Sequence, residues 1–292
     1  MNTADAGPSE RVKRVERAGP FLKWAGGKGQ LLSQFTSLYP RKIGRYLEPF
    51  VGSAAVFFDL RERFAGLRAT VSDNNKELIR CYEDVRDDVE GLIRRLRQHK
   101  TRHGREHYYS VRGRSLARLS PVARSARLIY LNKTCYNGLY RVNARGEFNV
   151  PIGSYKNPGI FKKDHLRAAS AALKDVRLEV RDFSACLRDV RAGAFVYFDP
   201  PYDPVSRTAS FTGYTERGFG VTEQERLAGV FRELDAKGCM VMLSNSDTPL
   251  IRKLYHGFRL KSVTARRAIN SNGRRRGAIG ELVVMNYAPG KG

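Results

Sequence analysis

The stretch RYLEPFVGSAAVFFDLRERFAGLRATVSD, residues 45–73, decides the fold class of this chain. Its first part, Arg45–Phe50, has the apolar character of a short buried strand, and Gly52 opens a turn into a helix-like segment, Ala54–Phe64. Ala69–Asp73 indicates a second strand. A strand, a helix and a second strand in succession are typical of a doubly wound α/β sheet, which is the fold class that we predict.

Five later segments also have the character of strands: Arg177–Arg181, Ala194–Phe198, Gly238–Leu243, Phe258–Ala265 and Ile279–Tyr287. The chain between them and the first two strands is helical in pattern and rich in arginine. We therefore predict one sheet domain made of residues 20–84 and 161–292. Residues 85–160 form an inserted, mainly helical module in this prediction, and residues 1–19 form a basic flexible tail.

The composition points to a polyanionic partner. Lysine and arginine number 53 against 29 acidic residues, which gives a net charge of +24. No run is long enough to span a membrane, so nucleic acid is favoured over an anionic membrane surface. The first 19 residues lack the apolar core of a signal peptide. We expect a monomeric, cytoplasmic protein that associates with the nucleoid through DNA.

Metal binding is not expected. The four cysteines have no paired CxxC spacing and stand at positions Cys81, Cys135, Cys186 and Cys239. His99, His103 and His107 are four residues apart and would align on a helix, as metal ligands sometimes do. However, Gly104 interrupts that segment and the neighbouring arginines repel a cation.

The tetrapeptide Asp199-Pro200-Pro201-Tyr202 directly follows the predicted strand Ala194–Phe198. The prolines end the strand because they remove backbone donors. An acid, a rigid turn and an aromatic ring are thus presented at a strand's carboxyl end, where open α/β sheets bind ligands.

This combination suits chemistry on an exocyclic amine such as adenine N6, whose lone pair is delocalised into the ring. Asp199 and the carbonyl of Pro200 can accept the two amine hydrogens and free that lone pair. Tyr202 offers a face on which the base can stack. The alternative is a strand-ending turn with a solvated aspartate and a packed tyrosine.

A second site is indicated by the loop of residues 48–54 between a strand and a helix. Asp73 ends the next strand, 21 residues after Gly52, a spacing that suits hydrogen bonds to ribose hydroxyls. The chain has no G-x-G-x-x-G here, so an adenosine without phosphates fits better than NAD. A tight turn that only needed a glycine is the alternative.

Two further pairs of residues could contribute to this possible nucleoside site. Trp24 and Lys28 lie in a Gly-rich segment that fails as a P-loop and could line a nucleoside site, although Trp24 could equally anchor a core. Asp182 and Phe183 follow another strand, where the acid could bind an adenine amino group or cap a helix.

The chain resembles the DNA adenine methyltransferase (Dam) family, in its alpha group, which is specific for adenine N6. The resemblance covers nearly everything after residue 20 and keeps the family's order. Its motifs are FLKWAGGK (21–28), YLEPFVGSAAVFF (46–58), SDNNKELI (72–79), LNKTCYNGLYRVNARGEFNVPIGSY (131–155), DPPYDPVSRTASFTGY (199–214), LSNSDT (243–248) and RRAINSNGRRR (266–276).

The resemblance implies a Rossmann-like S-adenosylmethionine-dependent methyltransferase sheet with an inserted DNA-recognition domain. The implied activity is methyl transfer to N6 of a flipped adenine in double-stranded DNA, with GATC as the leading target and no metal. The implied cofactor-binding residues are Trp24, Lys28, Phe50, Gly52, Asp73, Asp182 and Phe183. The implied catalytic residues are Asp199, Pro200, Pro201 and Tyr202.

The resemblance also implies a set of DNA contacts. Tyr136 and Asn137 would enter the base stack, Arg141 would bind a guanine, and Leu139 and Pro151 would touch thymine methyls. Lys23 would lie close to the target base.

Arginine density alone predicts phosphate contacts at Arg274, Arg275 and Arg276, although a solvated loop is the alternative. Ala54 stands where many relatives carry a second glycine, and Tyr140 lies inside the recognition segment.

Three other interpretations remain open at the level of the sequence. The tetrapeptide also suits cytosine N4 or an adenine in RNA, and a non-catalytic DNA-binding protein could keep the fold. A solitary enzyme and the partner of a restriction nuclease in a restriction-modification system have the same sequence features.

Overall fold

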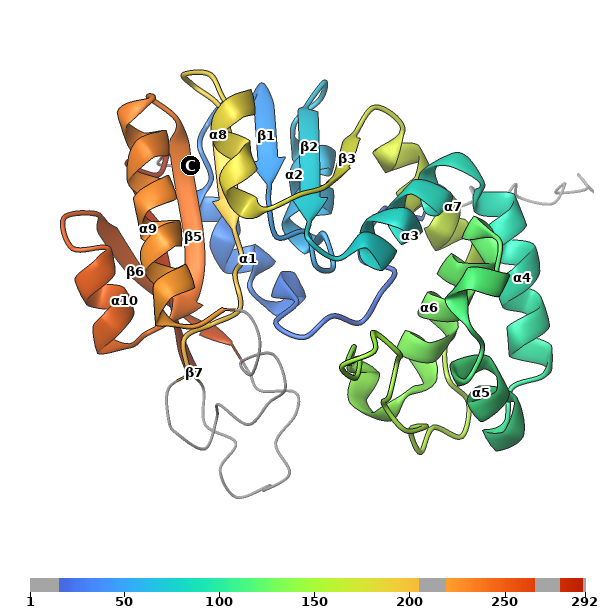
Figure 1. Cartoon of the computed structure of the whole chain (residues 1–292). Helices are drawn as coiled ribbons and strands as arrows, with labels where there is room; N and C mark the ends of the chain where they lie inside the picture. The colour runs from blue at the N-terminus through green and yellow to red at the C-terminus, as the bar shows by residue number, and fades with distance from the viewer. Residues whose placement is uncertain (1–15, 205–218, 266–278, 291–292) are drawn as a thin grey trace, which may run out of the picture.

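The computed structural model describes residues 16–204, 219–265 and 279–290, and a seven-stranded sheet lies at the centre of this part of the chain (Figure 1). The strand order is β3-β2-β1-β4-β5-β7-β6. The strands are β1 (Arg45–Glu48), β2 (Arg68–Asp73), β3 (Arg177–Val180), β4 (Phe195–Phe198), β5 (Met240–Ser246), β6 (Arg259–Ala265) and β7 (Ile279–Met285). The predicted α/β sheet is therefore confirmed, and each predicted strand is present.

The sheet is parallel from β3 to β5, and only β7 runs antiparallel to its neighbours β5 and β6. The order reverses between β1 and β4, which pair at Tyr46 and Phe195. β1 is shorter than predicted, because Pro49 has no N–H to donate to a ladder and the strand ends at Glu48. Ligands of open α/β sheets bind at such a reversal, beyond the carboxyl ends of the strands.

Helices cover both faces of the sheet (Figure 1). The α-helices are α1 (Leu32–Phe35), α2 (Ala55–Arg63), α3 (Lys76–Asp87), α4 (Val89–Thr101), α5 (Arg105–Arg112), α6 (Pro121–Thr134), α7 (Lys163–Leu173), α8 (Cys186–Asp189), α9 (Val221–Ala236) and α10 (Pro249–Leu254). Short 3₁₀ turns are η1 (Lys28–Gln30), η2 (Thr36–Leu38), η3 (Leu116–Arg118), η4 (Tyr136–Gly138) and η5 (Phe183–Ala185). None of the helices in the described ranges is both long and apolar enough to cross a membrane.

Alternate residues of the central strands enter two separate cores. Tyr46 of β1 and Phe195 of β4 pack in one cluster, whereas Leu47 and Val196 pack in the other. This alternation follows from the two-residue period of a strand. Helices α8, α9 and α10 cover the second core, and α1, α2, α3 and α7 cover the first.

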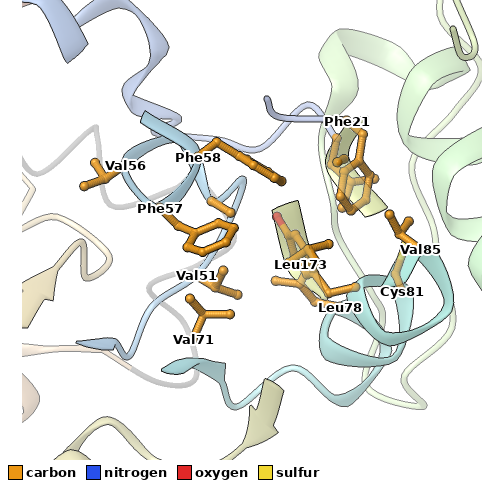
Figure 2. Close-up of a cluster of buried hydrophobic side chains, with 14 of the residues drawn as sticks. Phe21, Val51, Val56, Phe57, Phe58, Val71, Leu78, Cys81, Val85 and Leu173 are labelled. Atoms are coloured by element: carbon orange, nitrogen blue, oxygen red, sulfur yellow. The ribbon is translucent and has the colours of Figure 1, made fainter. Parts of the chain in front are cut away.

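The helical module α4–α6 is continuous with the first core. Figure 2 shows part of that cluster, in which Phe57 of α2 and Val71 of β2 lie on one side and Leu78 of α3 and Leu173 of α7 on the other. The same cluster continues to Ile93 of α4 and to buried residues of α6. The boundary predicted between residues 84 and 85 falls inside α3, so one helix belongs to both parts.

The side chain of Asn132, on α6, ties the amino-terminal segment to this module. Its Oδ1 accepts a hydrogen bond from the Lys23 amide (2.7 Å), and its Nδ2 donates to the carbonyl oxygens of Lys23 (2.6 Å) and Gly138 (3.1 Å). Asn132 is fully buried. Gly138 has a φ of +66°, and a Cβ there would lie 2.6 Å from Cδ of Lys23. The contact therefore requires a glycine.

We expect Asn132→Ala to destabilise the protein by about 1–3 kcal/mol, because the buried carbonyl of Gly138 and the partly buried backbone groups of Lys23 lose their partner. Urea unfolding measures this loss, and hydrogen exchange of the Lys23 amide should accelerate. Gln30→Ala, at an exposed nearby position, is the control and should change stability by less than about 0.5 kcal/mol. If hydrogen exchange of the Lys23 amide were unchanged in Asn132→Ala, the proposal that Asn132 holds the amino-terminal segment would be wrong.

Candidate active site

Asp199 lies at the carboxyl end of β4, beside the reversal in strand order. Its Oδ1 is 2.7 Å from Nζ of Lys28 and accepts a hydrogen bond from Oγ of Ser244 at 3.1 Å. Ser244 is in turn hydrogen bonded to the hydroxyl of Tyr197 at 2.8 Å. The predicted catalytic acid is therefore held by Lys28 and Ser244, which come from two separate parts of the chain.

The ion pair is asymmetric in exposure. The Lys28 side chain is 3% exposed and the Asp199 side chain 20%, so the carboxylate is the accessible partner. Burial raises the pKa of Asp199, and the Lys28 ammonium opposes this shift. The ammonium also donates to the carbonyl of Gly26 and lies 4.7 Å from the ring centroid of Tyr202. Lys28 thus favours the ionised, hydrogen-bond-accepting form of Asp199.

The other residues of the tetrapeptide are oriented by distant strands and helices. The hydroxyl of Tyr202 donates to Oε2 of Glu281 on β7 at 2.6 Å. Gln224 of α9 donates to the carbonyl of Pro201 at 2.9 Å. Within the described ranges, the carbonyl of Pro200 accepts no hydrogen bond, and the acceptor role stays a prediction.

The predicted cofactor loop lies next to this acid. Gly52 has a φ of +46°, and a Cβ there would lie 3.0 Å from Cδ1 of Trp24. Trp24 is partly exposed and stacks on Tyr140, with ring centroids 5.3 Å apart. Ala54 has a φ of +56°, in the left-handed region where a side chain costs about 1–2 kcal/mol. This strain explains why glycine suits that position.

Asp73 closes the same loop at the end of β2. One carboxylate oxygen accepts a hydrogen bond from the Asn75 amide at 2.9 Å, and the Gly52 and Asn74 amides also favour its charged form. Burial outweighs these hydrogen bonds and raises the pKa of Asp73 to about 6.

Asp182 and Phe183 lie close to Phe50, and both already have partners within the protein. Phe50 stacks on Phe183 with centroids 5.3 Å apart. Asp182 accepts from the Ser184 amide at 2.9 Å, so it caps η5 as the alternative interpretation expected. Arg226 of α9 binds both oxygens of Asp182 at 2.8 Å, and it holds the pKa of that carboxyl well below its usual range.

The predicted DNA contacts of the inserted module come together on one hairpin. The amide of Tyr136 donates to the carbonyl of Pro151 at 2.9 Å. Bridges between Cys135 and Ile152 and between residues 142 and 148 pair the two arms. Tyr136 is 50% exposed, and Asn137 adopts a φ of +54°. This turn therefore presents a large aromatic ring to solvent.

Arg141 lies on this hairpin, and Lys23 of the amino-terminal segment packs against Gly138 of the same hairpin. Nε of Arg141 donates a hydrogen bond to Oδ1 of Asn149 at 2.8 Å, and this bond lies at the protein surface. Nζ of Lys23 is 3.3 Å from the hydroxyl of Tyr155 and 4.4 Å from its ring centroid. Leu139 is half-buried beside them. Arg274, Arg275 and Arg276 lie outside the described residues.

The residues considered for metals lie elsewhere. His99 Nδ1 and His107 Nε2 are 3.0 Å apart, and His103 bonds to the Tyr130 hydroxyl. No cluster suited to a metal ion occurs in the described part of the chain, where all four cysteines are buried and unpaired.

Several residues that hold the site residues in place were not predicted from the sequence. Glu281 carries a signal that could have found it, because an acid in the apolar strand IGELVVM is unusual. Asn132 lies in the motif of residues 131–155, but the sequence did not predict its contact with Lys23. Gln224 and Arg226 lie on a helix with many polar residues and carry no comparable signal.

Comparison with known proteins identifies the family of this chain. The family described as D12 class N6 adenine-specific DNA methyltransferase matches residues 24–269. The type II methyltransferase M.MjaIII of Methanocaldococcus jannaschii is 45% identical over 285 residues, covering 92% of this chain and 99% of that protein. A DNA adenine methylase of Haemophilus influenzae is 34% identical, covering 91% of this chain and 93% of its own.

Among solved structures, the C-terminal domain of precorrin-6Y C5,15-methyltransferase from Rhodobacter capsulatus aligns with a TM-score of 0.38 and 12% identity. The alignment covers 86% of this chain and 84% of that one. The family match spans most of the chain, and the relatives are similar over nearly their whole length. The chain therefore belongs to the D12 class of N6 adenine-specific DNA methyltransferases, and it is an enzyme of that specificity.

Proposed function

We propose that the enzyme transfers a methyl group from S-adenosylmethionine to N6 of an adenine flipped out of duplex DNA, within the sequence GATC. The observation that carries this proposal is the Lys28–Asp199 pair at the end of β4. The Lys28 ammonium favours the ionised, hydrogen-bond-accepting form of Asp199, and it also lies 4.7 Å from the ring centroid of Tyr202.

The residues around the loop of residues 48–54 fit the cofactor. Gly52 leaves the space next to Trp24 free of a side chain, and Asp73, which accepts a hydrogen bond from the Asn75 amide, would also accept hydrogen bonds from ribose hydroxyls. Phe50 and Phe183 provide apolar ring surface for the adenine of the cofactor. Asp182 would bind the adenine amino group from its position beside Arg226. When bound, S-adenosylmethionine supplies an electrophilic methyl group on a positively charged sulfur.

Asp199 and the Pro200 carbonyl would each accept one hydrogen of the target amine, while Pro201, held by Gln224, keeps the turn rigid. Tyr202, oriented by Glu281, would stack on the flipped base. Aligning the nitrogen with the methyl carbon can lower the barrier by several kcal/mol. The carbon–nitrogen bond forms as the carbon–sulfur bond breaks, and the extra proton then leaves N6 for solvent. A strong base is therefore unnecessary before transfer.

The hairpin supports duplex DNA as the substrate. Tyr136 and Asn137 would fill the space that the flipped base vacates, since the tyrosine ring is exposed on a tight turn. Arg141 could exchange its bond to Asn149 for the N7 and O6 atoms of a guanine. Leu139 and Pro151 offer apolar contacts for thymine methyl groups, and Lys23 lies beside them.

The first test is methylation of unmethylated duplex DNA followed by single-base mapping of the products. N6-methyladenine confined to GATC is the expected result. Methylated adenine in another sequence would overturn the GATC assignment but keep the chemistry. Modification of cytosine N4, or of RNA alone, would overturn the proposed substrate.

Asp199→Ala should lower the methyl-transfer rate by at least about 10²-fold, because the amine loses the acceptor that frees its lone pair. DNA affinity should stay close to that of the parent protein. Asp164→Ala is the control, because Asp164 is exposed on α7, bonds to Arg167 there, and its loss should leave the rate nearly unchanged. Loss of DNA binding in a folded Asp199→Ala variant would contradict the role given to this residue.

The raised pKa of Asp73 predicts a pH dependence of cofactor binding. The ionised carboxylate is the acceptor, and in the free protein it takes up a proton as the pH falls through about 6. Affinity for S-adenosylmethionine should be constant above about pH 7 and weaken by about tenfold per pH unit well below 6. Titration calorimetry across this range measures the effect. Asp73→Asn should bind weakly at every pH, and the same slope in that variant would exclude Asp73 as its origin.

A further inference from the structure

A second cationic site lies in the helical module, away from the end of β4. Helices α4, α5 and α6 and the turn after η3 enclose a cavity of about 80 Å³. The basic side chains that line it are Arg95, Arg102, Arg114, Arg127, His99 and His107. No acidic residue lines it. We call this space the arginine cavity.

The periodicity of α4 builds one wall of the arginine cavity. Arg95, His99 and Arg102 are spaced by four and three residues, so they lie on one face of the helix. Arg97 and Lys100, on the same helix, point to other faces and do not line the cavity. Arg114, which follows the end of α5, also lines the opening of the cavity.

The side chains of Arg95, Arg102 and Arg114, which we call the rim arginines, differ from the arginines of this protein that form ion pairs. Arg124 pairs with Glu77, and Arg167 pairs with Glu90. By contrast, the side chains of Arg95, Arg102 and Arg114 make no ion pair or hydrogen bond within the described residues. Three guanidinium groups thus converge without a counter-charge.

The floor of the arginine cavity is rigid and polar. Arg127 is 8% exposed and donates to the carbonyl oxygens of Val111 (2.9 Å) and Arg112 (2.6 Å). His99 and His107 bond to each other at 3.0 Å. Burial and then the charges of His107 and the rim arginines lower the pKa of His99 to about 4. The imidazoles are therefore neutral near pH 7, and the local potential is positive.

We propose that the arginine cavity binds a phosphate-type oxyanion at a site separate from the methyl-transfer centre. Guanidinium groups match the geometry of phosphate oxygens and bind them through charge-assisted hydrogen bonds. The volume exceeds the roughly 10–15 Å³ that one water requires, so a small oxyanion with its water fits. The bound oxyanion offsets the repulsion between the rim arginines. Its source is either a backbone phosphate of duplex DNA or a free anion.

The site also has a direct structural route to the recognition hairpin. Arg127 bonds to the last carbonyls of α5, and Tyr108 of the same helix donates to the carbonyl of Val150 at 2.9 Å. Val150 precedes the predicted thymine contact Pro151. An occupied arginine cavity would thus hold α5 in place behind the hairpin.

The test is titration calorimetry of the full-length protein with inorganic pyrophosphate. The cavity variant is Arg95→Gln, Arg102→Gln and Arg114→Gln combined. The control variant is Arg97→Gln, Lys100→Gln and Arg118→Gln, which removes the same charge from exposed positions outside the cavity. We expect one saturable site in the parent protein. Affinity should fall at least about tenfold in the cavity variant and less than about twofold in the control.

Competition with a duplex that lacks GATC separates the two sources. If the duplex displaces pyrophosphate, the natural occupant is a DNA phosphate, and the cavity variant should also show a shallower dependence of DNA affinity on salt than the control. If both bind together, the occupant is a free anion. The proposal is overturned if pyrophosphate shows no saturable site, or if both variants lose affinity equally. Circular dichroism confirms that each variant is folded.

Discussion

Lys28 and Asp199 form an ion pair in the interior, and much of the active-site arrangement depends on it. A buried ammonium without its carboxylate would be strongly unfavourable, so the pair holds the amino-terminal segment against the end of β4. Burial raises the pKa of Asp199, and the Lys28 ammonium opposes this shift and so favours the ionised form. One interaction thereby contributes both to the position of this segment in the fold and to the charge of the site.

The short segment from Lys23 to Lys28 connects parts of the protein that are distant in sequence. Lys23 is clamped by Asn132 of the helical module, and Trp24 lies between Gly52 and Tyr140. Lys28 then reaches Asp199. Because these contacts follow one another within a few residues, we infer that a displacement of the hairpin would also act on the proposed cofactor loop and on Asp199. This continuity gives a physical basis for coupling target binding to methyl transfer.

The arginines of this chain have different environments, and the net charge of +24 alone does not separate them. Arg124 and Arg226 neutralise carboxylates and join helices to their neighbours. The arginines of the arginine cavity face one another around an open space. Within the described residues, Arg95, Arg102 and Arg114 can bind an external anion without breaking an internal ion pair, whereas Arg124 and Arg226 cannot.

Local sequence patterns determined the strands, the class of the sheet and the position of Asp199 at a strand's carboxyl end, because strand periodicity and proline chemistry act within a few residues. The partners of the site were decided by tertiary structure. Lys23 and Asn132 are 109 residues apart in sequence, and Tyr202 and Glu281 are 79 apart. Such pairs meet only because the strand order brings β7 beside β5 and because α3 carries the helical module to the sheet. No local pattern encodes that order, so these contacts required the folded chain.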